Sequence, residues 1–129
     1  MDRFSSNITF LYYSKFEEGC TFIEKVLDLE LVMDQGFAKV YRINKTSFLG
    51  AVKKSDGSIN GDYKGGTLVS LNTSNVVEEY HRVKELGVKD LSEIKLFEEI
   101  PLRSFFFKDD EFHDFEIQEF IDKEDKLIF

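Results

Sequence analysis

The chain has 129 residues, a length that suits one compact domain with its own core. Its formal net charge is −8, which argues against nucleic acid as a partner because phosphate binding needs a basic patch. The single cysteine, Cys20, leaves no internal disulfide and fits a reducing compartment. We find neither a secretory signal nor an apolar run that approaches the roughly 18 residues of a membrane helix. We therefore expect a cytoplasmic protein that binds neither nucleic acid nor membrane.

The first half of the chain predicts a strand, a helix and three further strands. Residues 8–13 are apolar and β-branched, as strands are. Ser14 and Glu17 have the spacing of a capping box at a helix start. An apolar stripe then recurs at helical spacing, made of Phe16, Cys20, Ile23 and Leu27. The three strands that follow are predicted at about 29–34, 37–43 and 46–53.

The second half repeats this order. A strand is predicted at 67–72, and Asn75 with Glu78 three residues later predicts a helix start. The helical stripe consists of Val76, Tyr80 and Val83, and Gly87 suits a left-handed helix end. The closing strands are predicted near 94–98, 103–108 and 113–120.

The sequence thus predicts an α+β protein built from two tandem βαβββ modules, about 7–53 and 67–120. Each module alone has too little core, so we expect the two to pack as one domain, 1–129. The glycine-rich residues 54–66 predict a flexible linker. The tail, 121–129, either frays or docks its apolar end on a partner subunit.

Polar and apolar residues alternate in the last predicted strand. Phe115 and Ile117 would face the core, whereas Asp114, Glu116 and Gln118 would share the opposite face. A short strand that places its middle polar residues on one face indicates that this face meets water or a ligand. His113 falls on the other side of the strand from Glu116, so we expect it to stabilise the preceding turn.

Three stretches carry a family likeness. Residues 22–31 read FIEKVLDLEL, residues 76–88 end in LGV, and residues 106–120 read FFKDDEFHDFEIQEF. In this order they resemble the vicinal-oxygen-chelate superfamily, which includes glyoxalase I, bleomycin-resistance proteins and extradiol dioxygenases. Its motifs read F-Y-x-x-V-L-G-L-x-L, L-G-V and F-x-D-P-D-G-H-x-x-E-I-x-E. Asp28 and Phe112 stand where these motifs have glycine, and Asp110 stands where they have proline.

The resemblance implies a glyoxalase/bleomycin-resistance-like fold, in which the two modules form a cupped mixed β-sheet, usually within a homodimer. It also implies four metal-ligand positions, one from each of four strands. Here these positions hold Ile8, Leu49 or Gly50, Leu68 and Glu116, with the register at Leu49 and Gly50 left open. Only Glu116 can bind a metal, whereas a catalytic metal normally has about three protein ligands. We therefore expect no metal, no other cofactor and no catalytic residue.

The cup is the expected ligand site. By strand alternation its ligand-binding residues are Ile8, Phe10, Tyr12, Leu49, Leu68, Ser70, Asn72, Asp114, Glu116 and Gln118. They combine an apolar, aromatic half with a polar, acidic half, the composition of a small-molecule site. The alternative is that Ile8, Phe10 and Leu68 fill the cup as core. Glu116 either meets a ligand cation, acts as a base, or hydrogen-bonds across the sheet to Asn72 or Tyr12.

These features favour a metal-free protein that binds a small molecule, as the bleomycin-resistance branch does, with acidic residues that attract a cationic part of the ligand. Two alternatives stay open. One is a metal-dependent lyase or dioxygenase with atypical ligands, such as Glu116 with His113 or His81. The other is a protein-interaction module with a filled cup. Cys20 lies on the buried helical stripe and is expected to be inert.

Overall fold

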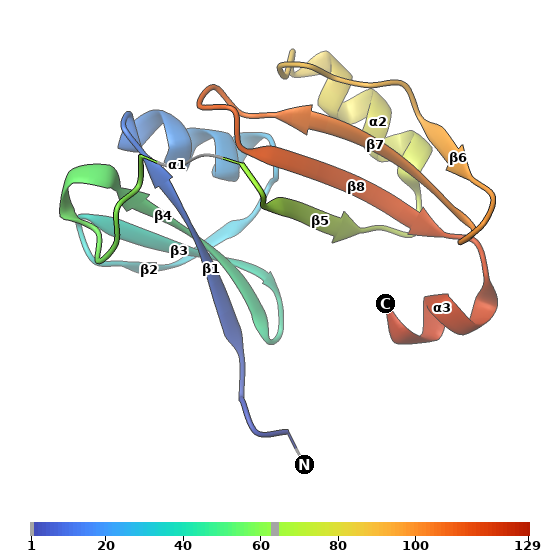
Figure 1. Cartoon of the computed structure of the whole chain (residues 1–129), viewed down its shortest axis with the longest axis horizontal. Coiled ribbons are helices and arrows are strands. Elements are labelled where there is room, and N and C mark those ends of the chain that lie inside the picture. Colours follow the sequence, from blue (N-terminus) through green and yellow to red (C-terminus); the bar gives the residue numbers. More distant parts are fainter. Residues whose placement is uncertain (1, 63–64) are drawn as a thin grey trace. The chain divides into compact units, whose positions relative to one another are not determined.

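The computed structural model describes residues 2–62 and 65–129 and contains the βαβββ order twice, as the sequence predicts (Figure 1). It divides into two compact units, Met1–Lys64 and Gly65–Phe129. The first contains β1 (Asn7–Tyr13), α1 (Phe16–Lys25), β2 (Glu30–Asp34), β3 (Ala38–Asn44), β4 (Ser47–Lys53) and the 3-10 helix η1 (Lys54–Asp56). The second contains β5 (Leu68–Asn72), α2 (Val76–Glu85), β6 (Lys95–Phe97), β7 (Leu102–Lys108), β8 (Asp114–Phe120) and α3 (Lys123–Ile128).

The first unit is a four-stranded mixed sheet in the order β1-β4-β3-β2, with β1 parallel to β4. Helix α1 packs on one face through its buried residues Gly19, Cys20 and Ile23. The Tyr41 hydroxyl of β3 donates to Glu24 Oε2 at 2.6 Å, which fastens the helix to the sheet. Burial raises the pKa of the Tyr41 hydroxyl well above its usual range, so Tyr41 stays a neutral donor.

The predicted capping box at Ser14 is wrong. Helix α1 begins at Phe16, with Lys15 as the N-cap residue and no side-chain cap hydrogen bond. The Gly19 N–H donates to the Lys15 carbonyl at 3.0 Å, so the first turn closes on Lys15 and leaves Ser14 one residue outside it. At α2 the predicted cap is confirmed, because Asn75 Oδ1 accepts from the Glu78 N–H at 3.1 Å.

The segment predicted as a flexible linker folds back on the first unit over residues 54–62. The Ile59 N–H donates to the Tyr12 hydroxyl at 3.3 Å. A Cβ at Gly57 would lie 2.1 Å from the Tyr12 ring, and one at Gly61 would lie 2.7 Å from it, so both glycines permit this backbone to lie on the ring. Predicted linker residues 63 and 64 lie outside the described residues.

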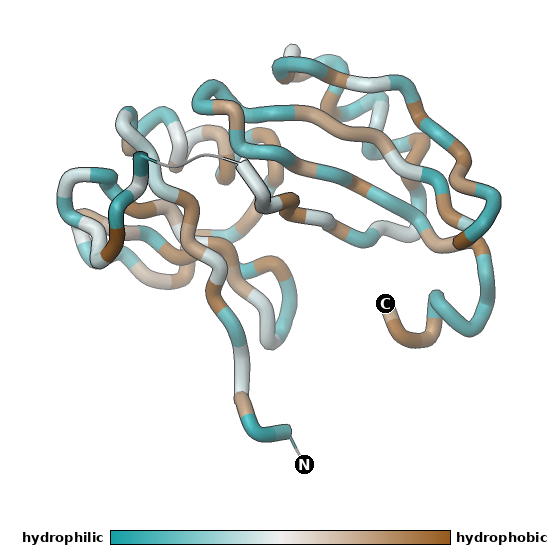
Figure 2. The backbone as a smooth tube through the Cα atoms, viewed as in Figure 1, coloured by the Kyte–Doolittle hydropathy of each residue, from teal (hydrophilic) through white to brown (hydrophobic). Residues whose placement is uncertain are grey.

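The second unit is a four-stranded mixed sheet in the order β5-β8-β7-β6, with β5 parallel to β8. Hydrophilic and hydrophobic residues alternate along β8 (Figure 2). Under α2, the rings of Phe105 and Phe107 stack 5.9 Å apart, Phe107 and Phe115 stack 5.5 Å apart, and Tyr80 meets Phe105 edge-on at 5.2 Å. Phenylalanine therefore supplies most of the bulk of this core.

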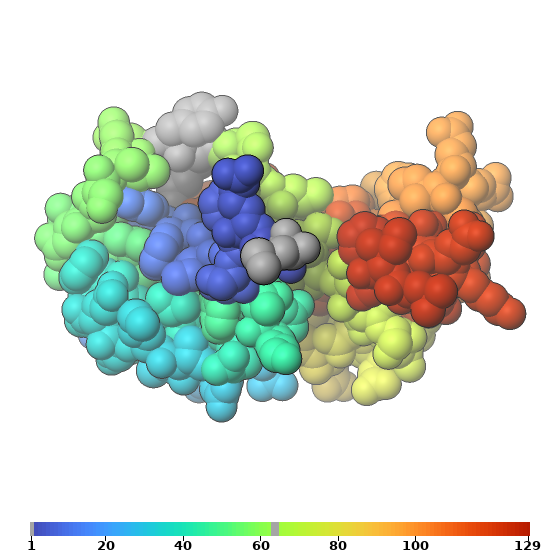
Figure 3. Space-filling model, turned by 90° about the horizontal axis from the view of Figure 1, so that it is seen from below, coloured from blue at the N-terminus to red at the C-terminus, as the bar shows by residue number. Residues whose placement is uncertain are grey.

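The tail does not fray. It forms α3, capped by Asp122, whose side chain accepts from the Glu124 N–H at 3.1 Å. Phe129 stacks on Phe120 of β8 with 4.8 Å between ring centroids. The tail lies at the surface of the second unit, and Leu127 is 89% exposed (Figure 3).

The two positions at which the family motifs have glycine keep the backbone that glycine would favour. Asp28 has φ of 57° and Phe112 has φ of 66°, and Gly87 at the end of α2 has φ of 71°. All three lie in the left-handed region, which costs a side-chain-bearing residue roughly 1–2 kcal/mol. The motif therefore reflects turn geometry that this chain retains with other residues.

Gly19→Ala should destabilise the protein. Alanine favours a helix over glycine, but its Cβ would lie 2.5 Å from the Tyr13 ring, which is 1% exposed. We expect a loss of about 1–3 kcal/mol in urea denaturation, because the packed ring cannot give way. Thr21→Ala, at an exposed position of the same helix, is the control and should change stability by less than about 0.5 kcal/mol. Unchanged stability in Gly19→Ala would contradict the packing of Tyr13 against α1.

Phe112→Gly should be more stable than Phe112→Ala by about 1 kcal/mol, because only glycine relieves the left-handed backbone at this position. Both variants lose the contact of Lys89 Nζ with the Phe112 ring, 5.4 Å from the centroid, so their difference isolates the backbone term. Chemical denaturation measures both. An alanine variant as stable as the glycine variant would rule out backbone strain at this turn.

Candidate functional site

The face of the second sheet opposite α2, which we call the open face, carries most of the predicted site residues. Strand register places side chains on this face in four cross-strand rows. The rows are Leu68–Asp114–Lys108, Ser70–Glu116–Phe106, Asn72–Gln118–Ser104–Lys95 and Phe120–Leu102–Phe97. The structure thus brings together Leu68, Ser70, Asn72, Asp114, Glu116 and Gln118, as the alternation predicts.

Glu116 lies at the centre of the open face and is 8% exposed. The Ser70 hydroxyl donates to Glu116 Oε1 at 2.9 Å. The cross-sheet partner is therefore Ser70, and the alternative of Asn72 is wrong. No ion pair among the described residues includes Glu116. A buried carboxylate with one hydroxyl donor and no cation is costly, so this position favours the approach of a positive charge.

In the rows on either side of Glu116, polar side chains hydrogen-bond to one another. Lys108 Nζ hydrogen-bonds to Asp114 Oδ1, and this bond holds the pKa of Lys108 above its usual range. Gln118 Nε2 donates to Asn72 Oδ1 at 2.9 Å. Because Lys108 balances Asp114, the expected acidic character of this face rests on Glu116.

Strand β7 adds residues to the face that sequence reasoning missed. Phe106 pairs with Glu116 in the register, and Lys95 Nζ of β6 lies 6.0 Å from the centroid of the Phe106 ring. Ser104 is fully buried, and its hydroxyl has no hydrogen-bond partner in the described part of the chain. Phe105, Phe106 and Phe107 are consecutive, so no alternation in the sequence shows which ring faces which side.

The turn before β8 is built around Asp109, which is 1% exposed. Asp109 Oδ1 accepts from the N–H groups of Glu111 at 3.0 Å and His113 at 2.9 Å, and Asp109 Oδ2 lies 2.8 Å from His113 Nδ1. This confirms that His113 stabilises the turn. The pair fixes where β8 begins and hence which residues reach the open face.

The first sheet has a different surface on its face opposite α1. Ile8 and Phe10 are 44% and 42% exposed there, and Tyr12 lies under the segment 54–62. A Cβ at Gly50 would lie 2.3 Å from the Phe10 ring, so Phe10 occupies the space above Gly50. Tyr12 and one side of the Phe10 ring thus pack within the first unit, whereas Ile8 and the rest of the Phe10 ring stay exposed.

Leu49 does not lie on the face that the prediction of a ligand-binding role requires. The register pairs Leu49 with Tyr41, which bonds to α1, and Leu49 is fully buried on that side. Gly50 pairs with Phe10 and lies on the opposite face. Residues 48–52 read FLGAV, an apolar run without alternation, so the sequence alone could not decide between the two.

The residues present do not fit the divalent metal that the fold implies. The four family positions hold Ile8, Gly50, Leu68 and Glu116, so three of them offer no donor atom. His113 is held by Asp109, and His81 lies on α2, on the other side of the second sheet. In residues 2–62 and 65–129 no group of three or more histidine, cysteine, aspartate or glutamate side chains could hold a metal.

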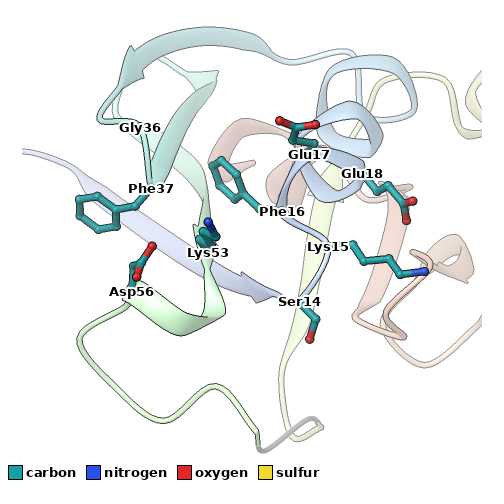
Figure 4. Close-up of a pocket in the computed structure, with 9 residues that line it drawn as sticks. All are labelled: Ser14, Lys15, Phe16, Glu17, Glu18, Gly36, Phe37, Lys53 and Asp56. Carbon is teal, nitrogen blue, oxygen red and sulfur yellow. The ribbon is translucent and has the colours of Figure 1, made fainter.

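A pocket of about 540 Å³ opens in the first unit where β1 and β4 end and α1 begins (Figure 4). Figure 4 shows the Phe16 and Phe37 rings beside Lys53 and Asp56. Its other lining residues are Ser14, Lys15, Glu17, Glu18 and Gly36. Both signs of charge line the pocket, with Lys15 and Lys53 beside Glu17, Glu18 and Asp56, and it contains none of the predicted site residues.

Cys20 is buried, and desolvation raises the pKa of its thiol. This agrees with the expected inert role. Within the described ranges, 2–62 and 65–129, no helix has the length and hydrophobicity that crossing a bilayer requires.

The fold has close counterparts among solved structures. A member of the glyoxalase/bleomycin resistance protein/dioxygenase superfamily from Sphaerobacter thermophilus aligns with a TM-score of 0.73 and 18% identity, covering 89% of this chain and 96% of its own. Lactoylglutathione lyase from Agrobacterium tumefaciens aligns at 0.71 and 16%, covering 87% and 90%. The fosfomycin resistance protein FosX from Mesorhizobium loti aligns at 0.68 and 19%, covering 98% and 99%.

The chain therefore has the fold of the glyoxalase/bleomycin resistance/dioxygenase superfamily, and the α+β architecture predicted from its sequence is confirmed. No protein-family model matches the chain, and no curated protein matches it. A shared fold at this level of identity leaves activity to be argued from the site.

Proposed function

We propose that this protein binds a small organic cation on the open face of the second sheet, without a metal ion. The observation that carries this proposal is Glu116, a carboxylate that is 8% exposed and has a hydroxyl but no cation as partner among the described residues. A cationic ligand would supply the missing charge, and its ion pair would form in a poorly hydrated position where charge-assisted hydrogen bonds are strong.

The neighbouring aromatic ring supports the same ligand class. Phe106 lies beside Glu116 in the register, and an aromatic ring next to a carboxylate suits an ammonium or guanidinium group. Lys95 Nζ lies near this ring, 6.0 Å from its centroid, an arrangement that supports a cation as the group that meets it. Leu68, 47% exposed, adds apolar surface at one end of the face.

The alternative of a lyase or dioxygenase would need a metal ion to polarise its substrate. The donor atoms at the family positions do not fit such an ion, so we favour binding over catalysis. The names of the lyase and the resistance protein describe those proteins, and they are compatible with a fold that takes up small molecules. The predicted homodimer and cytoplasmic location stay predictions.

Glu116→Gln should weaken the binding of choline by about tenfold or more, because the amide keeps an acceptor for Ser70 but loses the charge. Choline titrations monitored by NMR chemical shifts give the affinity, and 3,3-dimethylbutan-1-ol, the neutral isostere of choline, should bind far more weakly to the parent. Glu85→Gln, at an exposed position of α2, makes the same change in net charge and should bind as the parent does. Equal choline affinity in Glu116→Gln and the parent would contradict the proposal.

Protein purified without chelator or affinity tag should contain far less than one divalent metal ion per chain by plasma mass spectrometry, because three of the four family positions lack a donor. A content of about one ion per chain would overturn the proposal that the protein binds its ligand without a metal ion. Assays on vicinal dicarbonyl and catechol substrates would then test the lyase and dioxygenase alternatives.

A further inference from the structure

The open face carries a second charge that the proposed cation site does not use. Lys95 belongs to the edge strand β6 and pairs with Ser104 of β7, so its side chain starts on the open face. Its ammonium lies over the Phe106 ring at 6.0 Å from the centroid, at the outer limit of a cation–π contact, roughly 6 Å. Phe106 in turn pairs with Glu116. A positive and a negative residue thus come from β6 and β8, the two strands that flank Phe106 of β7.

These two charges do not neutralise each other. Neither Lys95 nor Glu116 takes part in an ion pair among the described residues, although Lys108 on the same face is paired with Asp114. Lys95 is exposed, so its ammonium can turn from the ring toward a ligand, whereas Glu116 is held by Ser70 and is nearly buried. The face therefore offers one fixed anion and one movable cation.

The residue opposite Lys95 on β7 has a small side chain. Ser104 is the β7 residue opposite Lys95, and it is small and fully buried. Its hydroxyl has no hydrogen-bond partner in the described part of the chain. A long side chain at this position would stand between the Lys95 stem and the Phe106 ring.

We propose that the ligand of the open face is a zwitterion, whose cationic group meets Glu116 and Phe106 while its anionic group meets Lys95. This inference rests on the proposed function and names its ligand class. A ligand with a cation alone must compete with the Lys95 ammonium for the Phe106 ring. The anionic group of a zwitterion draws the Lys95 ammonium away from the Phe106 ring and pairs with it. Lys95 then binds the ligand and no longer competes with it for the ring.

The test compares 4-(trimethylammonio)butanoate, a zwitterion, with its methyl ester, which keeps the cation and loses the anion. The parent should bind the zwitterion about threefold or more tightly than the ester in NMR or calorimetric titrations. In Lys95→Met the preference should reverse, because the zwitterion loses its partner and the ester loses its competitor. Lys95 is exposed on an edge strand, so the variant should fold as the parent does.

Lys89→Met is the matched control. Lys89 Nζ also lies over a phenylalanine ring, that of Phe112, but on the turn away from the open face. This variant should keep the parent's preference. A ratio of affinities that Lys95→Met leaves unchanged would overturn the zwitterion inference while leaving the cation site intact. Binding of neither compound to the parent, together with no response to choline, would instead count against the proposed function itself.

Discussion

The register of β8 between its two neighbours is the constraint on which the candidate site depends. Strand β8 pairs in parallel with β5 and antiparallel with β7, and this pairing places Ser70, Glu116 and Phe106 in one row. Because side chains alternate along a strand, a slip by one residue would turn Glu116 toward α2 and bring Phe115 to the open face. Such a slip would bury a carboxylate in an aromatic core, so the core and the site enforce the same register.

Two features hold this register from opposite sides of the strand. Under α2, Phe115 and Ile117 fill the core, and Phe115 stacks with Phe107 of β7 at 5.5 Å. At the start of β8, the buried Asp109 hydrogen-bonds to the backbone and the ring of His113. Phe112 adopts the left-handed conformation that the tight turn needs. The motif that carries the family likeness thus fixes where β8 begins, and with it the face on which Glu116 lies.

Sequence reasoning succeeded where a pattern has one solution and failed where it has several. Alternation in residues 113–120 has a clear period, so the placement of Glu116 opposite Phe115 followed from it. The runs FLGAV in β4 and FFF in β7 have no period, so the sequence decides neither between Leu49 and Gly50 nor which of the three rings lies beside Glu116. The position of Lys95 over Phe106 depends on the pairing of an edge strand of three residues, which no local pattern encodes. The predicted cap at Ser14 is wrong because a capping box specifies only a spacing of residues. It does not decide which carbonyl closes the first turn, and here it is that of Lys15.

The two modules share a topology but differ in the side chains that their parallel strand pairs carry. In the first sheet, the Phe10 ring lies over Gly50 and stays 42% exposed, and Tyr12 lies under the backbone of Gly57 and Gly61, so no polar group occupies these positions. In the second, the equivalent parallel strand pair carries Ser70 and Glu116, a polar pair that packing does not explain. Burying a carboxylate without a counter-charge lowers stability, and a fold keeps such a group where function uses it. The asymmetry between the two repeats therefore supports our proposal that the ligand binds on the second sheet.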